Sequence, residues 1–172
     1  MRKFLVSLMF GFLLLVIQAQ PQNHKSYPIK YVANVAYIVD GDTLHVKDLN
    51  GLKHKIRVAN IDAPEMNQAD GERSRQNLLF LVNKNVEVIV LYMDRYRREV
   101  SNIYYKNQDI AFKQVKDGYA WIYPGYAKKY LSSYRLKTYY QAQENAKIKR
   151  LGLWRNYGAI PPWLFRKNSK AI

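Results

Sequence analysis

The 172-residue chain contains no cysteine, so no disulfide can stabilise it. A hydrophobic core or a bound ion must do so instead, and about 150 residues are enough to build such a core. Acidic residues are also scarce, because 13 aspartates and glutamates stand against 28 lysines and arginines, giving a formal net charge of +15. This charge favours a polyanionic partner, such as nucleic acid, an anionic membrane or an anionic glycan. It gives no information about the fold.

Only one long apolar run is present, and it lies at the N-terminus. It extends from Phe4 to Ile17, follows a short positive segment and precedes Ala19, the pattern of a signal peptide cleaved after Ala19. An uncleaved membrane anchor is the alternative, but the run is shorter than the ~20 apolar residues of a spanning helix. We therefore expect a signal peptide at residues 1–19, a linker at residues 20–30, and a mature protein without a stable membrane span. It would be exported, that is, secreted, periplasmic or held in the cell envelope.

The remaining pattern alternates short β-like runs with a few helical ones. We expect strands at residues 31–39, 43–48, 54–61, 86–92 and 99–105, and helices at residues 71–83, 109–117 and 130–150. This order predicts a mainly β, α+β domain at residues 31–155, built as a five-stranded OB-fold barrel with three helices. A split α+β sandwich is the alternative. Residues 156–172, which include two consecutive prolines, are expected to form an irregular C-terminal extension.

Two short stretches concentrate the scarce acids, "VDGDT" at residues 39–43 and "NIDAPE" at residues 60–65. A hairpin with the loop Asn50-Gly51-Leu52 would place Asp40 opposite Asp62, with Cβ atoms roughly 5 Å apart. Carboxylates at that distance repel unless a proton or a cation lies between them. Each stretch alone is typical of an ordinary turn, but together they predict a site for a hard divalent cation.

Several blocks, in order and spacing, resemble the staphylococcal nuclease (thermonuclease) family over residues 31–155. They are "VDGDT", "IRVANIDAPE", a "GE" that opens a helix, "MDRYRR", "KDGYAWIY" and "KRLGLW". The resemblance implies an OB barrel with three helices and hydrolysis of DNA and RNA with bound Ca²⁺. It also implies products that end in 3′-phosphate, little sequence specificity, and a monomer.

The resemblance also assigns roles to residues of this chain. It implies calcium ligands in the side chains of Asp42 and Asp62 and the backbone carbonyl of Ala63, Asp40 as an outer-shell acid, Glu65 as the general base, and Arg57 and Arg98 as phosphate-binding residues. These types suit phosphodiester hydrolysis, because guanidinium groups bind phosphate oxygens in pairs and a carboxylate can take a proton from the attacking water.

The chain departs from the family where it has Arg97, since family members usually have glycine there, as in "DRYGR". If the turn shifts, Arg97 could replace Arg98. The family also places tyrosines on its substrate face, which makes Tyr96, Tyr123 and Tyr126 candidates for substrate binding, with packing as the alternative. His45 and His54 are expected to be surface residues of the hairpin.

Basic residues crowd the last expected helix and its approach, namely Lys128, Lys129, Arg135, Lys137, Lys147, Lys149 and Arg150. Such a surface predicts salt-dependent binding of nucleic acid with little regard to sequence. We therefore predict an exported calcium-dependent nuclease. A non-catalytic nucleic-acid-binding module of the same fold is the main alternative, and a cationic adhesion protein is a further one.

Overall fold

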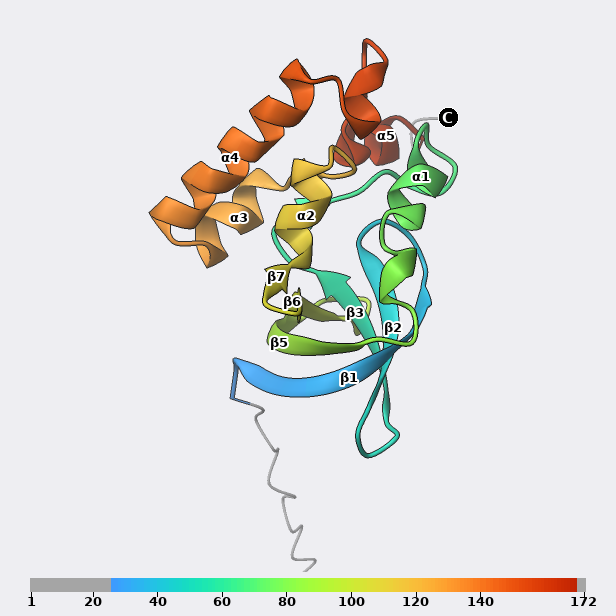
Figure 1. The fold of residues 1–172 in the computed structure, drawn as a ribbon, viewed down its shortest axis with the longest axis vertical. Helices are drawn as coiled ribbons and strands as arrows, with labels where there is room; N and C mark the ends of the chain where they lie inside the picture. Colours follow the sequence, from blue (N-terminus) through green and yellow to red (C-terminus); the bar gives the residue numbers. More distant parts are fainter. Residues whose placement is uncertain (1–25, 170–172) are drawn as a thin grey trace, which may run out of the picture.

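A computed structural model describes residues 26–169, in which five long strands close into a barrel. They are β1 (Ile29–Ile38), β2 (Thr43–Asp48), β3 (Lys53–Val58), β5 (Asn85–Met93) and β6 (Glu99–Tyr105). Their order around the sheet is β3-β2-β1-β5-β6, and a parallel pairing between β3 and β6 closes it. The expected five-stranded OB barrel is therefore confirmed (Figure 1).

The barrel interior is filled by alternate apolar residues, as the period-2 patterning of the strands requires. In β5 the valines at 86, 88 and 90 are buried, while the residues between them face outward. The registers of β1 and β5 shift between Val35 and Tyr37 and between Val90 and Tyr92. Such bulges bend strands and increase their twist, which a closed barrel needs.

The remaining elements lie at one end of the barrel, opposite the tip of the β2–β3 hairpin (Figure 1). They are β4 (Ile61–Asp62), α1 (Gly71–Gln76), the 3₁₀ turn η1 (Leu79–Leu81), β7 (Gln108–Asp109), α2 (Ile110–Lys116), β8 (Trp121–Ile122), α3 (Pro124–Tyr130), α4 (Ser133–Ile148), the 3₁₀ turn η2 (Gly152–Arg155) and α5 (Pro162–Ser169). No helix within residues 26–169 is long and apolar enough to cross a membrane. The expected signal peptide and most of the linker lie outside the described residues.

Five α-helices are present where three were expected, and two helix limits differ. The helix expected at residues 71–83 ends at Gln76, because Asn77 bonds to the side chains of Gln114 and Asp117 and the chain then tightens into η1. The helix expected at residues 130–150 begins later, since Ser132 caps α4 by accepting a bond from the Arg135 backbone.

The C-terminal extension is helical over α5, so the expectation of an irregular tail was wrong there. The two prolines that suggested irregular structure precede and begin this helix, and Pro162 is its first residue. A proline is well suited to that position, because the first N–H of a helix has no partner within the helix. The two prolines therefore mark the start of a helix and not an irregular segment.

The hairpin register also differs from the expected one. Thr43 pairs with Arg57, and the loop covers residues 49–51, because the Asp48 carboxylate accepts bonds from the backbone N–H groups of Asn50 and Leu52. This is a shift of two residues, so each side chain keeps its expected face while Asp40 and Asp62 are not paired across the hairpin. After β3 the chain turns at Asn60, which has a φ of 70°, and Asp62 joins the separate strand β4.

His54 is not a surface residue of the hairpin as expected. Its side chain is 13% exposed, lies between Asp48 and Glu99, and stacks on the Tyr31 ring. The closing β3–β6 pairing brings Glu99 to this histidine, and nothing in the hairpin sequence alone indicates that contact.

Candidate active site

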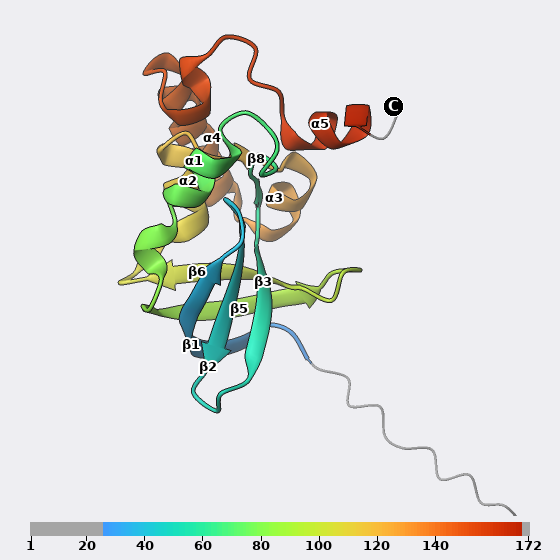
Figure 2. The same cartoon turned by 90° about the vertical axis from the view of Figure 1, so that its right-hand side faces the viewer.

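A cavity of about 1160 Å³ opens between the barrel end, the β5–β6 turn and α5. Figure 2 shows the β5–β6 turn and α5 extending toward the same side of the molecule. All the residues predicted for the site line this cavity: Asp40, Asp42, Arg57, Asp62, Ala63, Glu65, Tyr96, Arg98, Tyr123 and Tyr126. The structure therefore brings together residues from β3, β4, α3 and four connecting segments.

Close packing around two glycines fixes the loops that carry the acids. A Cβ on Gly41, between Asp40 and Asp42, would lie 1.8 Å from the Ser74 hydroxyl of α1. A Cβ on Gly71 would lie 2.1 Å from the backbone oxygen of Glu65. Helix α1 can approach both acidic segments only because these residues lack side chains. The Gly41 carbonyl also accepts a bond from the buried amide of Gln114 in α2.

The two central carboxylates lie next to one another and share one arginine. Asp42 and Asp62 are 5% and 2% exposed. The Nη2 atom of Arg57 lies 3.1 Å from an Asp42 oxygen and 2.8 Å from an Asp62 oxygen. Asp42 also accepts a bond from the Ala63 backbone N–H at 2.7 Å. The acids thus meet through the turn after β3, and not through cross-strand pairing.

A second arginine, which the sequence did not indicate, reaches Asp62 and also Glu65 from α5. Arg166 donates to both oxygens of Asp62, at 2.7 and 3.3 Å, and to Glu65 Oε1 at 2.7 Å. Burial would lower the pKa of Arg166, but the bonds to Asp62 and Glu65 outweigh it and raise the pKa above its ordinary range. In this arrangement a guanidinium group engages the carboxylate of Glu65.

The carboxylates of the site are poorly solvated, because they are buried close to one another. Burial raises the pKa of Asp62, the neighbouring Asp42 adds to the rise, and Arg166 opposes it. Burial, followed by the charge of Asp42, raises the pKa of Asp40 to about 7. Asp40 also accepts a bond from the Asp42 backbone N–H at 2.9 Å. This local excess of negative charge is what a bound cation would relieve.

The donor set can be compared with the needs of a calcium ion. Within residues 26–169 no three acidic or histidine side chains converge as metal ligands. The site instead offers two adjacent buried carboxylates, Asp42 and Asp62, and the backbone of Ala63, which also lines the cavity. Calcium accepts carboxylate, carbonyl and water oxygens together, so this set fits a hydrated divalent cation held by few protein ligands.

The turn between β5 and β6 places Arg98 in the cavity and leaves Arg97 outside its lining. Arg97 adopts a φ of 60°, the left-handed conformation that glycine takes easily, so the turn keeps its shape despite the arginine. Asp94 organises the turn by accepting bonds from the backbone and side chain of Arg98 and from the Tyr96 backbone. Burial would raise the pKa of Asp94, but the bonds from Arg98 outweigh it and lower the pKa.

One wall of the cavity is a row of five aromatic rings. Successive rings lie nearly parallel, with centroids 5.3 Å apart for Tyr130–Tyr92, 6.2 Å for Tyr92–Tyr126, 5.0 Å for Tyr126–Tyr123 and 5.7 Å for Tyr123–Trp163. Tyr123 and Tyr126 therefore pack on each other and also face the cavity. Tyr96 is 62% exposed, and the guanidinium groups of Arg95 and Arg98 lie over its ring.

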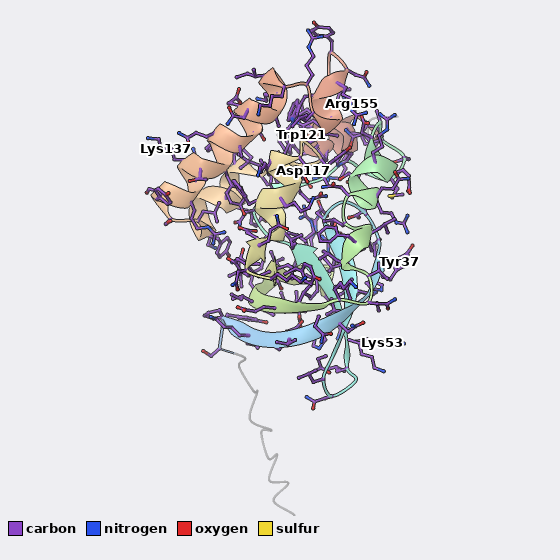
Figure 3. All side chains as sticks on the ribbon, viewed as in Figure 1. Tyr37, Lys53, Asp117, Trp121, Lys137 and Arg155 are labelled. Atoms are coloured by element: carbon purple, nitrogen blue, oxygen red, sulfur yellow. The ribbon has the colours of Figure 1, made fainter. Side chains whose placement is uncertain are left out.

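The basic side chains are spread over the surface and are partly paired. Arg135 bonds to Asp109 and Tyr104, and Lys147 lies 2.7 Å from Glu144. Figure 3 shows Lys137 projecting from α4 at one end of the molecule and Lys53 beside the hairpin at the other. The positive charge is thus spread over the surface and is not confined to α4.

Three features of the site could not be found from the sequence. The buried Gln114, and the α5 residues Trp163 and Arg166, belong to no motif that the sequence displays. Arg166 follows Glu65 by 101 positions and comes from a segment read as irregular. The one available signal was the rule that proline favours the first position of a helix, which would have suggested α5 but not its docking position.

Comparison with known proteins agrees with this geometry. A family model described as "Staphylococcal nuclease homologue" matches residues 55–156. A Haemophilus influenzae protein named an uncharacterized endonuclease is 39% identical over 142 residues, covering 82% of this chain and 76% of that protein. A Shigella flexneri protein named micrococcal nuclease is 36% identical over 146 residues, covering 79% and 80%. The staphylococcal-like nuclease CAN1 of Arabidopsis thaliana is 33% identical over 119 residues, covering 69% and 35%.

Proposed function

Because the chain belongs to the staphylococcal nuclease family, we propose that it is a nuclease that hydrolyses phosphodiester bonds of DNA and RNA. The observation that carries this proposal is the convergence of Asp42, Asp62, Glu65, Arg57 and Arg98 on one cavity. We further propose that the reaction depends on calcium and leaves 3′-phosphate ends.

The proposed mechanism divides the work among the residues of the cavity. Asp42, Asp62 and the Ala63 carbonyl would hold the calcium ion, and Asp40 would be an outer-shell acid. When bound, such an ion neutralises a phosphate oxygen and orients a water molecule. Glu65, which is 37% exposed at its side chain, accepts the proton of the attacking water.

Arg57 and Arg98 would stabilise the charge that builds on the phosphate oxygens during attack. Arg57 enters from β3, and Arg98 enters from the β5–β6 turn, directly before the strand β6 that pairs with β3. Thr43 connects Asp42 with Arg98, since its hydroxyl donates to Asp42 at 3.1 Å and accepts a bond from Arg98 at 3.4 Å. The aromatic row provides a wall on which unpaired bases could stack, which favours single-stranded substrates.

The proposal extends to location and partners. Residues 1–19 support export, and an exported enzyme commonly meets millimolar calcium, at which a site with few ligands still fills. The formal net charge of +15 supports binding of nucleic acid with little sequence preference and a steep dependence on salt. We propose that the protein acts as a monomer.

The test is digestion of single-stranded DNA and RNA by the purified protein, with calcium and with a chelator. We expect both substrates to be cut with calcium and to remain intact with the chelator. Radiolabelled products should carry a 3′-phosphate. Folded protein that retards DNA in a gel but leaves every substrate intact would instead identify a non-catalytic binding module.

Variants of two neighbouring arginines can identify which of them binds phosphate in the turn. Arg98→Gln is expected to lower kcat by about 10²- to 10³-fold, because it removes a charged donor to the transition state. Arg97→Gly should leave kcat within about twofold and raise the free energy of unfolding by about 1 kcal/mol, because it relieves the positive φ. Steady-state kinetics and chemical denaturation of the two variants test this. The reverse pattern would assign the role to Arg97.

The raised pKa of Asp40 predicts a pH dependence of stability in the metal-free protein. Between about pH 4 and pH 7 the folded protein holds a proton that the unfolded chain has released. The free energy of unfolding therefore falls as the pH rises through this window, by on the order of a few kcal/mol. Asp40→Asn should flatten this slope in melting experiments with a chelator, and equal slopes would contradict the prediction.

A further inference from the structure

We infer that Arg166 is an internal cation that competes with calcium for Asp62, so that helix α5 sets the calcium affinity of the site. This inference rests on the proposed calcium-dependent function. It adds a residue outside the segment that the family model matches, which ends at residue 156. It also gives a role to Arg166 of α5, a residue that the proposed reaction does not use.

The geometry of Arg166 is that of a substitute for a metal ion. Its guanidinium group faces both oxygens of Asp62 and also reaches Glu65, with closest distances of 2.7 Å to each residue. Asp62 is 2% exposed and has Asp42 as a close neighbour, so it needs positive charge in the absence of metal. Arg57 is shared between both aspartates, and Arg166 supplies the second positive charge.

The same guanidinium group is placed so that it can leave. The Arg166 side chain is 39% exposed, unlike that of Arg57, which is 13% exposed. Apart from its ion pairs, α5 and its approach contact the site through the stacking of Trp163 on Tyr123 and a bond from Gln68 to the Ile160 carbonyl. Arg166 can therefore turn into solvent, or toward a phosphate, without breaking the barrel.

A divalent cation and Arg166 cannot both bind Asp62 closely at low cost. Like charges at such distances repel strongly in a partly buried site, where screening by water is weak. Calcium must therefore displace the guanidinium group from Asp62. Since the same group binds Glu65, its departure also frees the carboxylate that is proposed to take a proton. Calcium occupancy and access to Glu65 are thus coupled through one side chain.

The primary test is the calcium Kd, measured by isothermal titration calorimetry on wild type, Arg166→Gln, Arg166→Lys and Lys167→Gln. Arg166→Gln should bind calcium about tenfold or more tightly, because the competing cation is gone. Arg166→Lys should lie between it and the wild type. Lys167→Gln is the matched control, since Lys167 is an exposed cation on the same helix that also lines the cavity but makes no ion pair among the described residues. Its Kd should stay within about twofold.

A second readout follows the helix itself. The chain has no cysteine, so Leu164→Cys, at a position 44% exposed on α5, provides a unique site for a fluorescent label. Calcium should lower the anisotropy of this label in the wild-type background, as α5 loosens. In the Arg166→Gln background the anisotropy should already be low and should not respond.

The outcomes separate this inference from the proposed function. If Arg166→Gln binds calcium no more tightly than the wild type, while digestion still requires calcium, the inference is overturned and the function stands. If none of the four proteins binds calcium, the calcium site and the inference both fail. Tighter binding by Arg166→Gln with an unchanged control supports the inference, whether or not the variant cuts nucleic acid.

Discussion

Replacing Glu65 with glutamine is expected to lower kcat on single-stranded DNA by about two to four orders of magnitude. Glutamine keeps the size and polarity of the side chain but cannot accept a proton from water. The change leaves Asp42, Asp62 and Arg57 in place, so the calcium Kd should remain near that of the wild type or become slightly tighter. Single-turnover cleavage and calcium titration measure the two quantities separately.

A matched control for this substitution is Glu144→Gln on α4. Glu144 is exposed, lies outside the cavity lining and pairs only with Lys147 among the described residues. Its replacement should change kcat by less than about twofold. If Glu65→Gln cleaves DNA at the wild-type rate, Glu65 is not the general base, and another group or the solvent must take the proton.

Arg57→Gln should combine a large loss of activity with a loss of stability. Its guanidinium group donates to Val58, 2.6 Å away, and lies between Asp42 and Asp62. Removing it leaves two buried carboxylates with less compensation, and breaking such a buried pair costs about 3–5 kcal/mol. The loss of a charged phosphate donor should in addition lower kcat by about 10²- to 10³-fold.

The stability effect of Arg57→Gln should depend on calcium, which distinguishes it from simple misfolding. A cation bound by the two aspartates would replace much of the missing positive charge. The difference in Tm between variant and wild type should therefore be largest with a chelator and smaller at saturating calcium. Arg73→Gln is a suitable control, because Arg73 is exposed and, within residues 26–169, pairs only with Asp70. An equal loss of Tm with and without calcium would contradict this account.

The sequence predicted the parts of the fold that depend on local patterns. The strand expected at residues 99–105 coincides with β6, and Asp109 caps α2 by accepting a bond from the Phe112 backbone, as expected. These features follow from alternation and capping, which act over a few residues. The gathering of the acids was also predicted, because it follows from the motifs and their spacing.

Features set by contacts to the loop backbone or by distant parts of the chain were missed. The hairpin register depends on how the Asp48 carboxylate binds the loop backbone, and the expected loop was one residue out of place. The burial of His54 depends on Glu99, which lies 45 positions further along the chain. The docking of α5 on the site depends on Arg166 and on the Trp163–Tyr123 contact, and neither follows from a local pattern.

The parallel pairing that closes the barrel has a consequence for folding kinetics. It sets Arg57 directly against Val100, so the strand that carries Arg57 meets the strand that follows Arg98 across 43 residues of sequence. Contacts of such long range form slowly, because the entropy of loop closure opposes them before they contribute stability. Activity should therefore return with the slowest refolding phase. A nascent chain would hold both arginines without an assembled site, and the nucleic acids around it would be spared until closure.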